Sequence, residues 1–158
     1  IFFHGSIIKF LKATENAIGS TVGILIQFPL YFGIMGMFQS TGIIQDFSEF
    51  FQNISNETTY PIFTFISAGI VNFFVPSGGG QWYIQGPLVI QSAIEMGIPL
   101  KKSIMALAYG DQLTNMMQPF WAIPLLGITG LKAKDILPFT FILMIVGFMV
   151  FTIGLFVF

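Results

Sequence analysis

Two apolar stretches of this chain are each interrupted by polar and helix-breaking residues, and these interruptions constrain the fold more than any other feature. The first is the run 76–82, Pro-Ser-Gly-Gly-Gly-Gln-Trp, and the second is the run 110–115, Gly-Asp-Gln-Leu-Thr-Asn. In a bilayer every backbone N–H and C=O group needs a hydrogen-bond partner, so an interruption persists only where protein buries it or where it lines a cavity. We therefore expect both runs to lie at a binding site, as in secondary transporters whose substrate binds near the membrane midplane.

The composition indicates an integral membrane protein. Apolar residues make up 54% of the 158 residues and charged residues only 8%, against about 25% charged residues in ordinary soluble domains. The net charge is −1 and all six basic residues are Lys, so we expect no nucleic-acid partner. Cys is absent, and no nucleophile, base and orienting group recur at a usable spacing, so we do not expect an enzyme. Because the chain begins with Ile rather than Met, we interpret it as part of a longer protein.

Hydropathy and segment length predict an all-α, polytopic membrane protein with a single membrane domain over residues 1–158. The predicted segments are a transmembrane helix at 17–38, an external loop with an interfacial helix at 40–59, a re-entrant hairpin at 60–98 with its tip at 76–82, a discontinuous helix at 103–130, and a transmembrane helix at 136–158. The segment 103–130 is broken at 110–115 and interrupted a second time at Pro119 and Pro124.

The hairpin competes with a simpler alternative, two plain spans joined by a surface loop. Its arms hold 16 and 17 residues, so each is about 24 to 26 Å long as a helix, and length alone fits either arrangement. The tip carries no charge, whereas a solvated loop normally does. The uncharged tip therefore favours the re-entrant hairpin.

Asp111 is the first candidate functional residue. Of the seven acidic residues, only Glu95 and Asp111 fall inside apolar segments, and Glu95 lies near the end of its arm, where it can reach the interface. A carboxylate at bilayer depth costs about 2.5 to 3.5 kcal/mol, so Asp111 should face the protein interior. With Thr114 and Asn115 it forms a candidate coupling-ion site, because such oxygen ligands bind Na⁺, and Asp111 could carry a proton instead. The alternative is a polar patch that only holds helices together.

The run 76–80 is the candidate anion site. It exposes backbone N–H groups, and a helix beginning near Gln81 would direct its positive end at a bound anion. Since the chain has no Arg and every Lys lies in a predicted loop, a carboxylate must be held by backbone amides and by hydroxyl and amide side chains, which suits a small monocarboxylate. The candidate substrate-binding residues are Ser77, Gly78, Gly79, Gly80, Gln81, Trp82, Gln85 and Gln118. The aromatic side chains that could line a pocket for a short acyl chain, or could instead only pack or anchor, are Trp82, Tyr83, Phe120 and Trp121.

Three parts of the chain carry a resemblance to a known family. They are the run 72–82, the triplet Gln85-Gly86-Pro87, and the run 108–121 with its Ala-Tyr-Gly-Asp, Thr-Asn and Gln-Pro-Phe-Trp motifs. The chain resembles the C-terminal part of the short-chain fatty acid transporter family, the bacterial carriers of acetoacetate and butyrate type. That family is similar to a wider ion-transporter superfamily whose fold uses inverted repeats, each with a re-entrant hairpin and a broken helix. The resemblance implies that residues 77–81 form the hairpin tip, that Asp111, Thr114 and Asn115 form the broken-helix tip, and that this chain is half of an inverted-repeat fold.

The resemblance also implies a function. We expect a secondary active transporter, or the C-terminal part of one, that moves short-chain fatty acids across the bacterial cytoplasmic (inner) membrane by symport with H⁺ or Na⁺ and without another cofactor. The expected partners are the carboxylate substrate, membrane lipid, and the missing N-terminal repeat or a second copy of the chain. Because family members are several hundred residues long, the alternative is an inactive truncated remnant or an assembly partner. A channel is disfavoured because residues 136–158 have only Thr140 and Thr152 as polar side chains.

Overall fold

The computed structural model describes residues 2–157, and for Ser20, Ile24, Gln39, Pro119 and Phe120 it describes the backbone alone. All regular structure in this range is helical, which confirms the predicted all-α class. The helices are α1 (Ile7–Ile18), α2 (Val22–Thr41), α3 (Ile43–Asn53), α4 (Tyr60–Asn72), α5 (Gly78–Glu95), α6 (Leu100–Asn115), α7 (Ile123–Thr129) and α8 (Ala133–Val157), with the short 3₁₀ turns η1 (Phe2–His4), η2 (Gly19–Thr21) and η3 (Pro119–Ala122).

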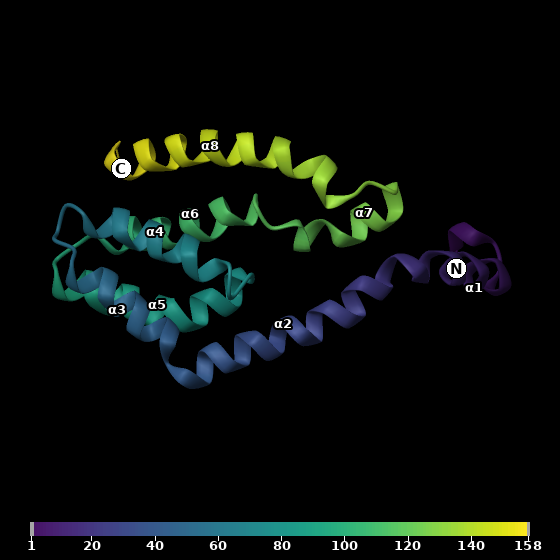
Figure 1. Cartoon of the computed structure of the whole chain (residues 1–158), viewed down its shortest axis with the longest axis horizontal. Coiled ribbons are helices and arrows are strands. Elements are labelled where there is room, and N and C mark those ends of the chain that lie inside the picture. The colour runs from purple at the N-terminus through teal and green to yellow at the C-terminus, as the bar shows by residue number, and fades with distance from the viewer. Residues whose placement is uncertain (1, 158) are drawn as a thin grey trace.

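The helices α4 and α6 form the centre of the structure. They make the most extensive contact between any two elements, and α3, α5 and α8 pack around them. Figure 1 shows α8 above this pair and α3 with α5 below it, while α2 runs obliquely away from the bundle toward α1. Helix α1 therefore lies apart from the helices that hold the predicted site residues (Figure 1), whereas α2 reaches the segment after α4, where the hydroxyl of Tyr31 donates to the carbonyl oxygen of Phe73 at 3.1 Å.

Helix α8 has the properties of a membrane span. Its 25 residues give a length of about 37 Å, which exceeds the roughly 30 Å of a bilayer core. Only 6% of its most apolar stretch is buried against other parts of the chain. Among the described residues, α8 is the one helix both long and apolar enough to cross a membrane. Two shorter apolar helical stretches, Leu25–Phe38 within α2 and Tyr60–Asn72, accompany it.

Two glycines allow α4 and α6 to approach closely. A Cβ atom on Gly110 would lie 2.3 Å from the carbonyl oxygen of Phe65 and 2.8 Å from the amide nitrogen of Gly69. A Cβ atom on Gly69 would in turn lie 3.2 Å from the Cγ2 atom of Thr114. Small residues at such crossings let helix backbones pack directly against each other, as is common in membrane bundles.

Of the two interruptions predicted within 103–130, the structure has one next to Pro119 and none at 110–115. The sequence analysis placed a break at 110–115, but α6 is continuous through these residues and ends at Asn115, and the irregular segment is 116–118, before η3. Gly110 is held within the helix because it packs against α4. The irregular segment 116–118 lies directly before Pro119, which lacks an N–H group and disfavours helical geometry at the residue before it.

The helices α4 and α5 form a helical hairpin joined by residues 73–77. Ser77 is the N-cap of α5, and its Oγ accepts a hydrogen bond from the backbone N–H of Gly80 at 3.3 Å. The three glycines 78–80 are therefore the first turn of α5 and not a tight turn, so α5 begins earlier than the predicted position near Gln81. The two arms are tied together by the hydroxyl of Tyr60, which donates to the carbonyl oxygen of Val89 at 2.9 Å.

Candidate functional site

Asn72, the last residue of α4, lies at the centre of the candidate site. Its side chain is fully buried, and its Nδ2 atom lies 2.9 Å from the carbonyl oxygen of Asp111, 3.0 Å from Oγ1 of Thr114 and 2.9 Å from Oδ1 of Asn115. An amide group has two hydrogens, so it satisfies two of these three acceptors at a time. The three predicted coupling-ion residues thus meet around a fourth that the sequence analysis did not assign. A polar amide at the end of an otherwise apolar helix, next to the tip, was the signal that could have identified it.

The cluster contains more oxygen acceptors than donors. Oδ1 of Asn72 and Oδ1 of Asp111 are both buried and have no hydrogen-bond partner among the described residues. The hydroxyl of Thr114 is already used, since it donates to the carbonyl oxygen of Gly69 at 2.9 Å. A buried acceptor without a partner costs about 1 to 3 kcal/mol. A cation, or a proton on the carboxyl group, would remove part of this cost.

The hairpin tip lies against the same carboxyl group. A Cβ atom on Gly78 would lie 3.5 Å from Oδ2 of Asp111, so the first turn of α5 is in contact distance of the acidic side chain. The N-terminal end of a helix carries a partial positive charge and free N–H groups. The structure therefore brings the glycine run and the end of α6 together, which are the two interruptions first identified in the sequence.

Two of the predicted substrate-binding residues have side chains that are engaged within the hairpin. Gln81 donates from Nε2 to the carbonyl oxygen of Ala68 and to Oε1 of Gln85, both at 2.8 Å. Gln85 donates from Nε2 to Oγ of Ser48 on α3, also at 2.8 Å. Both glutamines are almost completely buried. Their side chains link α3, α4 and α5, and this polar chain is a structural feature that sequence spacing did not reveal.

Of the other predicted residues, Gln118 and Trp121 lie just beyond the end of α6, and Trp82 and Tyr83 lie on α5. Gln118 is buried and donates from Nε2 to the carbonyl oxygen of Asn72 at 3.0 Å. Trp121 donates from Nε1 to the carbonyl oxygen of Asn115 at 2.8 Å. Both side chains therefore bind backbone carbonyls at helix ends. Trp82 packs against Gly86 on its own helix, Tyr83 is 78% exposed, and the side chain of Phe120 lies outside the described part of the structure.

An apolar cavity adjoins the hairpin tip. It has a volume of about 240 Å³ and lies between α2 and the segment before α5, lined by Phe28, Tyr31, Phe32, Met35, Pro76 and Ser77. Ser77 is the one lining residue that the sequence analysis assigned to the substrate site. The contribution of α2 could not be inferred from sequence, because nothing in an evenly apolar helix indicates which of its faces meets the tip.

The candidate site contains one carboxyl group. Among residues 2–157 no group of three or more His, Cys, Asp or Glu side chains lies close enough to hold a metal ion. The potential ligands at the end of α6 are instead a single carboxylate with neutral amide, hydroxyl and carbonyl oxygens. Hard oxygen ligands with one negative charge are suited to a monovalent cation.

Comparison with known proteins identifies the family. The sequence model of the short chain fatty acid transporter family matches residues 1–158. A Haemophilus influenzae protein provisionally named short-chain fatty acid transporter is 48% identical over 156 residues, covering 99% of this chain and 35% of the relative. An Escherichia coli K12 protein with the same provisional name is 45% identical over 155 residues, covering 98% of this chain and 35% of the relative. No solved structure matches the chain.

The chain thus spans about a third of the length of these curated relatives, 35% in each case. The family match covers the motifs at 72–82 and 108–121 that carried the resemblance in the sequence, and it confirms that resemblance. The all-helical fold and the length and composition of α8 are consistent with a membrane protein. Because the match extends over the whole sequence, this chain belongs to the short chain fatty acid transporter family.

Proposed function

We propose that this chain is part of a multi-pass secondary transporter that moves short-chain fatty acids, or other small monocarboxylates, across the bacterial inner membrane by symport with Na⁺ or H⁺. The family and the names of the two relatives support the substrate class. One observation carries the proposed mechanism, namely that Asn72, Asp111 and the first turn of α5 meet at one place. This convergence supports a transport site better than an inactive remnant.

In the membrane, α4 and α5 form the proposed re-entrant hairpin. The two arms hold 13 and 18 residues, so they are about 20 and 27 Å long, both short of the roughly 30 Å needed to cross the hydrocarbon core. The proposed discontinuous helix consists of α6, the segment 116–118, η3 and α7. Together they make half of an inverted-repeat site, and the rest of the full-length protein supplies the other half.

The coupling ion binds at the acceptor cluster at the end of α6. Its ligands are drawn from the buried oxygens of Asp111, Asn72 and Asn115, two of which have no partner among the described residues. The ion also controls substrate binding by charge. Two like charges about 5 Å apart repel by about 3 kcal/mol at an effective dielectric constant of 20. A carboxylate beside an ionised Asp111 therefore binds roughly 100-fold more weakly. Neutralising Asp111 with a cation or a proton removes this repulsion, which couples the two fluxes.

The substrate carboxylate binds at the N-terminal turn of α5. Backbone N–H groups of Gly78 and Gly79 and the hydroxyl of Ser77 are the donors, since no Arg exists in the chain. The acyl chain enters the cavity of about 240 Å³ beside α2, whose walls include Phe28, Phe32 and Met35. A short aliphatic chain fits a cavity of this size and apolar lining, and the polar end remains at the tip beside the ion.

Uptake by the full-length protein in proteoliposomes tests this function. Labelled butyrate and acetoacetate are supplied with a Na⁺ gradient, a pH gradient, both or neither. We expect one gradient to drive accumulation in the parent protein and in an Asp135→Asn control, whose carboxylate lies in the first turn of α8. The Asp111→Asn and Asn115→Ala variants should lose gradient-driven uptake. Unchanged uptake in both variants would contradict the proposed ion site, and no uptake by the correctly folded full-length protein would contradict the transport function.

A further inference from the structure

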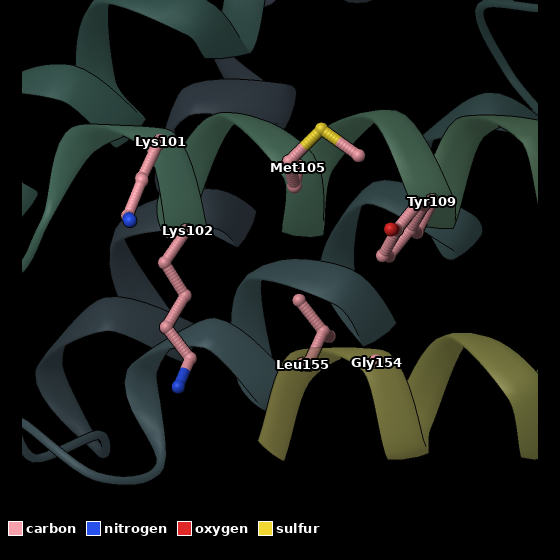
Figure 2. Close-up of a pocket in the computed structure, with 6 residues that line it drawn as sticks. All are labelled: Lys101, Lys102, Met105, Tyr109, Gly154 and Leu155. Carbon is pink, nitrogen blue, oxygen red and sulfur yellow. The ribbon is translucent and has the colours of Figure 1, made fainter. Parts of the chain in front are cut away.

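We propose that the groove between α6 and α8 is a binding site for an anionic phospholipid. The groove has a volume of about 300 Å³ and is lined by Lys101, Lys102, Met105, Tyr109, Gly154 and Leu155. Figure 2 shows the two lysine side chains at one end of the groove, Tyr109 at the other, and the last turns of α8 along its side. The site thus combines two cationic groups with an apolar trough, which is the complement of an anionic headgroup followed by an acyl chain.

The groove runs along the axis of α6. Lys101, Met105 and Tyr109 are four residues apart, so they lie on one face of the helix over about 12 Å. The ring of Tyr109 stacks on Phe151 with centroids 4.5 Å apart and planes at 5°. Gly154 leaves room beside that ring, because a Cβ atom there would lie 3.8 Å from Cε2 of Tyr109. The trough therefore has a rigid aromatic end and an open wall at Gly154.

The positive charge at the mouth has no acidic counterpart on its own helix turn. Lys101 and Lys102 lie in the first turn of α6, which holds no acidic residue and receives no side-chain cap from Pro99. The helix dipole adds partial positive charge at this end, which is an unfavourable position for two lysines. Glu57 lines the adjoining cavity of about 470 Å³ that shares Lys102 and Leu155, and it can offset part of the charge on Lys102. A phosphate bound at the mouth would offset the remainder.

The position of the groove selects a membrane lipid as its occupant. Helix α8 is long enough to cross the bilayer, and only 6% of its most apolar stretch is buried against the rest of the chain. Its faces therefore meet lipid. Gly154 and Leu155 lie in its last turns, which places the groove mouth at the level of the headgroups. Basic pockets between membrane helices at this depth bind anionic headgroups. The groove is also separate from the Asp111 cluster, so this inference depends on membrane placement and not on the proposed transport site.

Lipid retention by the full-length protein tests the site. Detergent-purified protein is incubated with phosphatidylglycerol or phosphatidylcholine, and the bound lipid is measured by native mass spectrometry. We expect a preference for phosphatidylglycerol that falls roughly 25-fold in a Lys101→Gln/Lys102→Gln variant, because each lysine near an anionic lipid contributes roughly fivefold. The matched control is Lys132→Gln/Lys134→Gln, which removes the two lysines around the start of α8 and should keep the preference.

A second variant separates the trough from the charges. Gly154→Leu fills the groove beside Tyr109 without altering either lysine, and it should weaken phosphatidylglycerol retention while leaving the unfolding temperature without added lipid unchanged. Excess butyrate should not displace the lipid, since a short free acid lacks the acyl length of the trough. Equal retention of the two lipids by the parent protein, an unchanged preference in the Lys101/Lys102 variant, or displacement by butyrate would each overturn the proposal.

Discussion

The Nδ2 atom of Asn72 lies 2.9 Å from the backbone carbonyl oxygen of Asp111. This contact fixes the end of α4 to the last turns of α6, and the same nitrogen reaches the side-chain oxygens of Thr114 and Asn115. One amide therefore sets the position of every predicted coupling-ion residue. Its removal should affect both folding and the binding of an ion.

The first prediction concerns Asn72 itself. Asn72→Ala removes the donor shared by three acceptors and should lower the free energy of unfolding by about 1 to 3 kcal/mol. Asn53→Ala, at the exposed end of α3, should change it by less than about 0.5 kcal/mol. Thermal unfolding in detergent measures both. Equal melting temperatures for the two variants would contradict the central position of Asn72.

The second prediction concerns the crossing of α4 and α6. Gly110→Ala places a methyl group where the carbonyl oxygen of Phe65 would be 2.3 Å away, so the helices must separate, at a cost of about 3 kcal/mol or more. Gly36→Ala in α2 meets no atom within 4 Å and should be neutral or stabilise by up to about 1 kcal/mol. Denaturant or thermal unfolding of the two variants distinguishes these outcomes. A Gly110→Ala protein as stable as its parent would mean that the helices do not approach so closely.

The sequence predicted the helices better than the contacts between them. Apolar run length and the uncharged glycine tip indicated helical segments at 60–98 and 136–158, where the structure has α4, α5 and most of α8. Within 103–130 the structure lacks the break predicted at 110–115, although it has an irregular segment beside Pro119. A Gly such as Gly110 can interrupt a helix or let another helix pack closely against it, and only the neighbouring helix decides between these outcomes.

The candidate site could likewise be predicted only in part, because its contacts join residues that lie far apart in the sequence. Asp111, Thr114 and Asn115 were identified because polar residues in apolar segments are costly. The partners of Gln81 and Gln85 lie 13 residues upstream on α4 and 37 residues upstream on α3, so no local pattern showed that their amides are bonded within the protein. Asn72 and the α2 side of the apolar cavity depend on the same long-range packing.

The third prediction concerns the buried polar chain of the hairpin. Gln85→Ala removes one of the two acceptors of Nε2 of Gln81 and the donor to Oγ of Ser48, and it should lower the free energy of unfolding by about 1 to 3 kcal/mol because buried polar groups lose hydrogen bonds. Gln91→Ala removes an exposed bond to Glu95 on the same helix and should cost less than about 0.5 kcal/mol. Thermal unfolding of the pair measures the difference, and similar values would contradict a structural role for the chain.

The fourth prediction concerns the length of the transported acid. Met35 lines the apolar cavity beside Ser77, and Met35→Ala enlarges it. Each buried methylene group contributes about 0.8 kcal/mol, so competition of unlabelled hexanoate against labelled butyrate should improve by roughly fourfold or more. Met37→Ala, an exposed position on the same helix, is the control and should leave the competition unchanged. An unchanged ratio in Met35→Ala would place the acyl chain elsewhere.

The central claim is that the N-terminal turn of α5 and the carboxyl group of Asp111 form one site for the substrate and its coupling ion. The chain has no Cys, so the full-length protein, with any other cysteines replaced, can carry a single thiol at Gly78→Cys, beside Oδ2 of Asp111. The rate of its reaction with a maleimide in proteoliposomes should fall when butyrate and the coupling ion are added together. In Gly78→Cys/Asp111→Asn, where the negative charge is already absent, butyrate alone should lower the rate and the coupling ion should add nothing, and a Gly36→Cys control should respond to neither. A Gly78→Cys rate that is the same with and without butyrate and the ion would contradict the account.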